Sequence, residues 1–280
     1  MNTDEPSAVI ESESIANTIS IPVALEPLRR IRWWVHLILI GGYFVPSILF
    51  SRANPHPVLS QTSAGLLTVC AMQMAVFGVM FGLGWWSSRA TSEQMLLPWR
   101  PGWWVVPLGF AYSIAIRIAV FVLALGVSAI LLATVFDQHQ LAEFWRASQP
   151  NIRQVVSVSA ARGNSIYAWL LITVVSFVVA GLREELWRTG TLAAMRALWP
   201  KAFGSRAGEL GAILLIAIAF GAGHLRMGLM AAVVAGVLGV FLGVILVLHR
   251  SVWPAVIAHG CFDALSFALI AWLPTNLQPF

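Results

Sequence analysis

Charged side chains are scarce in this 280-residue sequence. Asp, Glu, Lys and Arg together make up 10% of it, against about 25% in soluble domains. Hydrophobic residues make up 59%, and the mean hydropathy is +0.80. This composition excludes an ordinary soluble domain and predicts a polytopic membrane protein. The 17 basic residues are spread between apolar runs and form no basic stripe, so the pI of 10.0 does not indicate nucleic-acid binding.

Cysteine and targeting signals are also lacking. The two cysteines, Cys70 and Cys261, both stand in apolar segments, so we expect no disulfide framework. The amino-terminal stretch has neither the basic start nor the short apolar core of a signal peptide. Its polar, acidic composition predicts a disordered cytoplasmic tail over residues 1–28, followed by a membrane domain over residues 29–280.

Long apolar runs dominate the rest of the chain, and a membrane span needs about 20 such residues. The runs cover residues 33–50, 64–86, 103–135, 166–198, 210–224, 228–248 and 252–273. The third run fits one tilted helix or a span plus an interfacial piece. We therefore predict an all-α, polytopic membrane helical bundle of seven or eight transmembrane helices. Residues 136–164 form a long polar connection, which we expect to be functional or mobile.

The residues that flank these runs predict how the chain is oriented in the membrane. Arginines and Lys201 are more numerous on the side that is cytoplasmic when the amino terminus is inside, which favours that orientation. Tryptophans gather at the ends of the runs, as an aromatic belt does. We predict a multi-pass protein of the cell inner membrane, with the lipid bilayer as its surroundings.

Polar residues interrupt the fourth run after Leu182. A charge at a helix centre in the bilayer costs about 2.5–3.5 kcal/mol, so such residues are either functional or placed at the water interface. Glu184 and Arg188 are four residues apart, the spacing of an intrahelical ion pair, and Glu185 then lacks that partner. A solvated helix end would explain the same residues.

The fifth and seventh runs carry further candidates. His259 and Asp263 share one helix face, where the acid can orient the imidazole. Phe220 and His224 end the fifth run, and His224 could also simply cap that helix. In straight spans His224 and His259 would lie on opposite sides of the membrane, so their convergence requires a short or tilted fifth span. The single residues His36, Gln73, Arg117 and His249 are expected to make helix-packing hydrogen bonds or to extend toward the interface.

Three motifs together resemble a known family. EExxxR (Glu184, Glu185, Arg188), FxxxH (Phe220, His224) and HxxxD (His259, Asp263) follow one another on successive apolar segments. In this order they resemble the CPBP intramembrane proteases, which include the type II CAAX prenyl endopeptidases and the bacterial Abi-like proteins. The resemblance covers residues 184–263 and implies a catalytic core over about 166–273.

The resemblance implies hydrolysis of a peptide bond in a membrane-associated peptide or protein substrate, which the family allows to be prenylated. Glu184 would activate water with help from His224, Glu185 would orient these groups or add a second carboxylate, and Arg188 would fix the glutamates. His259 and Asp263 would face the oxyanion, and Phe220 would line the substrate cleft. Many members have Asn in place of Asp263, and an ionised Asp cannot donate a hydrogen bond.

The cofactor and two other functions stay open at this stage. The enzyme could need no cofactor, or it could be a metalloprotease with a divalent metal such as zinc held by Glu184, His224 and His259, although HExxH is absent. A non-catalytic membrane immunity or scaffold protein is the main alternative function. A proton-coupled carrier also uses buried acids and histidines, but it favours an internal repeat that the sequence does not show.

Overall fold

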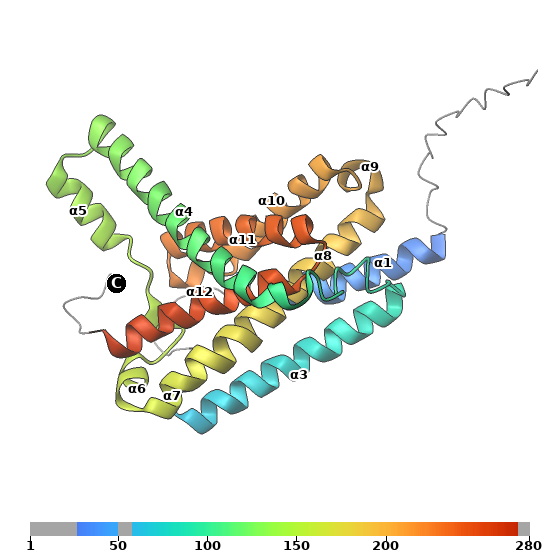
Figure 1. Cartoon of the computed structure of the whole chain (residues 1–280), viewed down its shortest axis with the longest axis horizontal. Coiled ribbons are helices and arrows are strands. Elements are labelled where there is room, and N and C mark those ends of the chain that lie inside the picture. The colour runs from blue at the N-terminus through green and yellow to red at the C-terminus, as the bar shows by residue number, and fades with distance from the viewer. Residues whose placement is uncertain (1–26, 50–57, 274–280) are drawn as a thin grey trace, which may run out of the picture.

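The computed structural model describes residues 27–49 and 58–273, and every regular element within these ranges is helical (Figure 1). The all-α prediction is confirmed for this part of the chain. Of the predicted tail, residues 1–26 lie outside the described ranges, whereas Pro27 and Leu28 already belong to the first helix.

The helices follow the apolar runs of the sequence. In chain order they are α1 (Pro27–Ile40), η1 (Gly41–Phe44), α2 (Val45–Leu49), α3 (Ser63–Ser88), η2 (Gly102–Trp104), α4 (Val105–Thr134), α5 (Gln138–Ala147), η3 (Ile152–Gln154), α6 (Val158–Gly163), α7 (Ser165–Leu170), η4 (Leu171–Glu184), α8 (Glu185–Leu198), α9 (Pro200–Phe203), α10 (Arg206–Ala222), η5 (Leu225–Met227), α11 (Leu229–His249) and α12 (Trp253–Trp272).

Five helices within the described ranges are long and apolar enough to cross a membrane. They are Ser63–Ser88, Gly102–Thr134, Ser165–Leu198, Leu229–His249 and Trp253–Trp272. The first and fifth predicted spans correspond to shorter helices, α1 with 14 residues and α10 with 17. The multi-span helical bundle is therefore supported, and the count of seven or eight spans stays a prediction.

The third run is one continuous helix rather than a span plus an interfacial piece. Its second half leans away from the bundle and leads into α5, so that the two helices form an arm (Figure 1). The polar connection 136–164 is not a plain loop, because it contains α5, η3 and α6. Asp137 starts α5 with a capping box, in which its side chain accepts from the Gln140 backbone and the Gln140 side chain accepts in return.

The fourth run is helical from Ser165 to Leu198, as predicted, and ends before Pro200. Its middle part, η4, is a π-helix of 14 residues, which the sequence analysis did not predict. Such helices have i→i+5 hydrogen bonds and usually occur as single turns near functional sites. The Ser176 hydroxyl donates to the carbonyl of Leu171, five residues earlier, at 2.9 Å. The π-helix ends at Glu184, and the α-helical turn resumes at Glu185.

Helix α12 packs along η4 and against α4. Glycines permit this close approach, since a Cβ on Gly181 would lie 2.9 Å from the Val256 carbonyl oxygen. On the facing helix, a Cβ on Gly260 would lie 2.3 Å from the Phe177 ring. Small residues at such a crossing let helix backbones meet in a membrane bundle. This crossing places the His259 side of α12 against the end of η4.

Helix α1 packs against α3 and α8. The buried His36 lies at this junction, with Nδ1 2.9 Å from Ser88 Oγ and Nε2 3.0 Å from the Gly190 carbonyl oxygen. His249 makes a comparable contact with the Tyr112 hydroxyl, at 2.8 Å. The predicted packing role of these two histidines is confirmed.

An ion cluster joins the end of α8, the start of α10 and the end of α11. Glu209 is 2% exposed, and its Oε1 accepts from Arg196 at 2.9 Å and from Arg250 at 2.5 Å. Burial alone would raise the pKa of Glu209, but the hydrogen bonds and charges of Arg250 and Arg196 lower it below its ordinary value. The carboxylate therefore ties three segments together at neutral pH.

We expect Glu209→Gln to lower the free energy of unfolding by about 1.5–3 kcal/mol, because hydrogen bonds to charged groups are lost. Since the folded-state pKa is depressed, the stabilisation is present above the unfolded pKa and is lost as pH falls through the folded pKa. Thermal unfolding in detergent at neutral and acidic pH measures both effects. The wild type and the variant should converge in acid, and a gap that does not depend on pH would contradict the assignment.

Candidate active site

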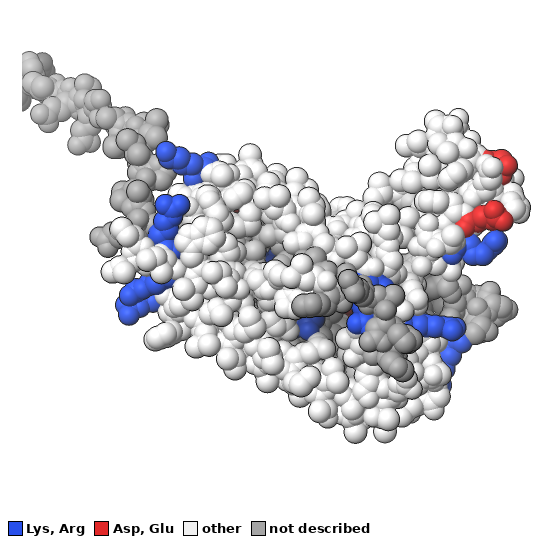
Figure 2. Space-filling view, turned by 180° about the vertical axis from the view of Figure 1, so that it is seen from behind, with Lys and Arg blue, Asp and Glu red and all other residues white. Residues whose placement is uncertain are grey.

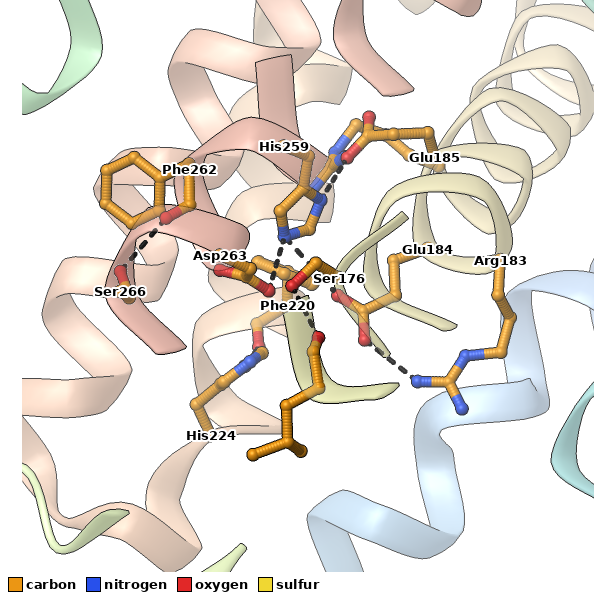
Figure 3. A network of polar contacts seen from close by, with 12 residues as sticks. Ser176, Arg183, Glu184, Glu185, Phe220, His224, His259, Phe262, Asp263 and Ser266 are labelled. Atoms are coloured by element: carbon orange, nitrogen blue, oxygen red, sulfur yellow. Dashed lines mark hydrogen bonds and ion pairs between the residues drawn. The ribbon is translucent and has the colours of Figure 1, made fainter. Parts of the chain in front are cut away.

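The motif residues meet inside the bundle, where the end of η4 faces α12 and the end of α10 (Figure 3). Glu184 and Glu185 straddle the junction of η4 and α8, and His259 and Asp263 lie on α12. Glu185 is 0% exposed and His259 is 2% exposed. These residues do not form a solvated helix end, so that interpretation of the charges is wrong.

Glu185 is bound from two sides. The His259 Nδ1–H donates to its Oε1 at 2.9 Å, and Arg188 forms an ion pair with the same oxygen. This corrects the predicted pairing of Glu184 with Arg188, in which Glu185 was left without a partner. A helix allows both i,i+3 and i,i+4 contacts, and Arg188 pairs with Glu185 while another cation binds Glu184.

That cation is Arg183, which the sequence analysis did not include in the site. Its Nη2 donates to Glu184 Oε1 at 2.9 Å, and its Nη1 donates to Gln73 Oε1 on α3 at 2.6 Å. Gln73 had been expected to make a helix-packing hydrogen bond, and it does so through Arg183. Two features of the sequence pointed to this contact. Gln73 is a polar residue within an apolar run, and Arg183 is a fourth charged residue directly before the motif of Glu184, Glu185 and Arg188.

The second ring nitrogen of His259, Nε2, lies near two carboxylates. Its Nε2 lies 3.9 Å from Glu184 Oε2 and 3.8 Å from Asp263 Oδ2. Because Glu185 accepts from Nδ1, the ring is fixed with Nε2 directed at the gap between these two acids (Figure 3). The predicted proximity of His259 and Asp263 is thus present, and Glu184 completes the group.

Phe220 brings the segment of the second motif, FxxxH, into contact with the residues of the other two motifs. Its ring centroid lies 6.1 Å from that of His259, 4.7 Å from that of His224 and 4.8 Å from the Arg188 Cζ. The Nδ1–H of His224 donates to the Phe220 carbonyl at 2.8 Å, so the neutral ring keeps Nε2 as its acceptor. The short α10 ends just before His224 and thereby brings His224 and His259 to the same region, as convergence required.

Arg117 of α4 reaches α12 beside Asp263. Its guanidinium bonds to the Phe262 carbonyl and, at 3.1 Å, to Ser266 Oγ, and its Cζ lies 4.2 Å from the Phe262 ring centroid. Its charge acts on Asp263 through space. The expected packing role is confirmed. Three arginines thus accompany the three carboxylates of the site, which limits the cost of burying charge.

The residues named as possible metal ligands do not form a metal site. Within the described ranges, no group of three His, Cys, Asp or Glu side chains has the spacing to hold a metal ion. One nitrogen of His259 is bound to Glu185, which leaves one nitrogen, Nε2, 3.9 Å from Glu184 Oε2. We therefore derive no step through a metal.

The burial of Glu185 leads to a stability prediction. In Glu185→Gln, the 1%-exposed Arg188 would keep its charge without a carboxylate, so we expect a loss of about 3–5 kcal/mol in the free energy of unfolding. Glu184→Gln is the matched control, because Arg183 retains Gln73 and the loss should be about 1 kcal/mol. Denaturant unfolding in micelles would measure both, and equal losses would argue against Glu185 as the central ion.

The comparisons with known proteins were made against families, curated proteins and solved structures. Neither the curated proteins nor the solved structures produced a match to this chain. The family comparison matched residues 166–265 to "Type II CAAX prenyl endopeptidase Rce1-like". This segment contains all three motifs, whereas Gln73, Arg117 and Ser266 lie outside it. The five apolar helices support a multi-pass membrane protein, and residues 166–265 are similar to this endopeptidase family. The resemblance inferred from the motifs is thereby confirmed: residues 166–265 match the Rce1-like family of type II CAAX prenyl endopeptidases.

Proposed function

We propose that the protein is an intramembrane endopeptidase that hydrolyses a peptide bond in a membrane-associated peptide or protein, with Glu184 as the base for the attacking water. The observation that carries this proposal is the position of Glu184 Oε2, 3.9 Å from a His259 nitrogen whose ring is fixed by Glu185. A base beside an oriented imidazole is the arrangement that general acid–base hydrolysis needs.

Glu184 begins the reaction. Its Oε1 is occupied by Arg183, which leaves Oε2 to accept a proton from a water molecule. The water oxygen attacks the scissile carbonyl carbon, and the proton held by Glu184 later passes to the leaving amine. His224 can share this proton, since Nε2 is its acceptor when Nδ1–H is bonded to Phe220.

His259 stabilises the oxyanion of the tetrahedral intermediate. In its imidazolium form, Nε2–H donates to that oxygen while Nδ1–H stays bonded to Glu185. Asp263 accepts as a carboxylate, so we assign it to orienting His259 from 3.8 Å rather than to donating. This assignment explains how the Asp variant of the third motif can work without an amide donor.

Arg188 and Phe220 support the reacting groups. Arg188 holds Glu185, and Phe220 packs against Arg188 and both histidines. We propose that Phe220 forms the wall of the substrate cleft beside His224. The fully buried Glu185 serves to orient His259 in this mechanism, and Glu184 is the carboxylate that reacts.

The substrate reaches this site from within the membrane. We propose seven membrane segments with a cytoplasmic amino terminus, in which α1 with α2 and the short α10 complete the five long helices. The family description names prenylated CAAX proteins, so a carboxyl-terminal prenylated peptide belongs in any substrate panel, beside an unmodified membrane-tethered peptide.

The test of the base is cleavage of this panel by the purified protein. Glu184→Gln should lower kcat/KM by about 10²–10⁴-fold, the usual contribution of a general base. Glu143→Gln, a change in an exposed glutamate of α5, is the matched control and should retain activity. A strong chelator should leave wild-type cleavage intact. Cleavage that survives in Glu184→Gln would contradict the mechanism, and absence of wild-type cleavage would favour the scaffold alternative.

Arg183 is a positioning residue in this mechanism. Arg183→Gln releases Glu184 from its link to Gln73, and we expect kcat to fall about 10–100-fold with KM nearly unchanged. Arg183→Lys should recover part of kcat because it keeps a charge near Glu184. Arg153→Gln, at an exposed position, is the control. A parallel change in KM, or no recovery in the Lys variant, would indicate a purely structural role.

A further inference from the structure

A cavity lies at the end of the bundle, away from the motif residues. It has a volume of about 400 Å³ and is lined by Arg100, Arg196 and Arg250, together with Trp33, Leu96 and Ala197. Arg196 follows Glu185 by eleven residues on α8, which corresponds to about 16 Å along a helix axis. The cavity is therefore separate from the candidate active site, and the proposed function makes no use of it.

The walls of this cavity are firmly held. The segment between α3 and η2 forms one wall and is bonded to the turn between α11 and α12. Leu96 O accepts from Val252 N at 2.7 Å, Pro98 O accepts from Ser251 Oγ at 2.8 Å, and Leu97 O accepts from Trp253 Nε1 at 2.8 Å. A cavity shaped by such contacts is preorganised for a ligand.

The arginines retain donors that could bind an anion. A guanidinium has five N–H groups. Arg196 uses one for Glu209 and one for the Gln94 carbonyl, and Arg250 uses one for Glu209. Arg100 uses one for the exposed Glu93. Three arginines against the carboxylates of Glu93 and Glu209 leave the cluster positive.

The position of the cavity indicates the kind of anion. Trp199 at the end of α8 and Trp253 at the start of α12 stand close in the chain to Arg196 and Arg250, at helix ends where an aromatic belt meets the lipid headgroups. Figure 2 shows Lys and Arg at this end of the bundle, and further Lys and Arg at the opposite end. The end with the cavity is the one that we propose to be cytoplasmic, and the cytoplasmic leaflet carries anionic lipids.

We propose that this cavity binds the phosphate of an anionic phospholipid from the adjacent leaflet. The arginines contact the phosphate as bidentate donors, and Trp33, Leu96 and Ala197 contact the apolar part of the lipid next to it. Basic pockets between membrane helices on the cytoplasmic side are suited to such headgroups. A bound lipid would link α1, α8 and the turn before α12.

The first experiment measures lipid binding to the full-length protein in detergent by native mass spectrometry, without any protease substrate. The probes are phosphatidylglycerol, phosphatidylcholine and inorganic phosphate. We expect phosphatidylglycerol to be retained in preference to phosphatidylcholine. The double variant Arg100→Gln/Arg250→Gln should bind it about 10–30-fold more weakly. Arg30→Gln/Arg206→Gln removes two exposed arginines that do not line the cavity and should bind as the wild type does.

Three results would overturn the proposal. They are equal retention of both lipids, an equal loss in the control variant, which would indicate diffuse surface charge, and competition by inorganic phosphate at concentrations similar to the lipid. A second variant, Ala197→Trp, fills the cavity while keeping every arginine and should also weaken binding. Thermal unfolding of each variant confirms that it is folded, and normal lipid binding by folded Ala197→Trp would contradict the site.

Discussion

The buried carboxylate of Glu185 is the interaction on which the site depends. An isolated ion inside a membrane bundle is strongly unfavourable, and Glu185 is stabilised by Arg188 on its own helix and by His259 on α12. The second contact crosses between helices far apart in the sequence. It therefore fixes both the position of α12 and the orientation of the His259 ring, and every proposed catalytic contact follows from that orientation.

The division of work between the two glutamates follows from the same geometry. Glu184 ends the π-helix and Glu185 begins the α-helix, so the change of helix type falls between two neighbouring acids. Glu185 is enclosed by its partners, whereas Glu184 keeps one oxygen toward His259. The two adjacent glutamates therefore differ in role: Glu185 has a structural environment and Glu184 a reactive one.

Two groups of interacting charges in this protein have different surroundings. The deep group pairs three carboxylates with Arg183, Arg188 and Arg117 between helices. The group at the bundle end has an arginine excess around Glu209 and faces the boundary between lipid and water. A deep group must be nearly neutral because no water compensates its charge, whereas a boundary group can keep an excess that attracts anions.

Local sequence determined much of this protein. Apolar runs located the helices, Pro200 ended the fourth one, and the three motifs identified six charged or imidazole residues and Phe220. Sequence spacing could not determine which partner each charge takes, because Arg188 lies within helical reach of both glutamates. The tertiary structure decided this, since Arg183 bridges Glu184 to Gln73 and α12 brings His259 to Glu185. The arginine cavity is likewise tertiary, because its lining residues come from segments that lie far apart in the chain.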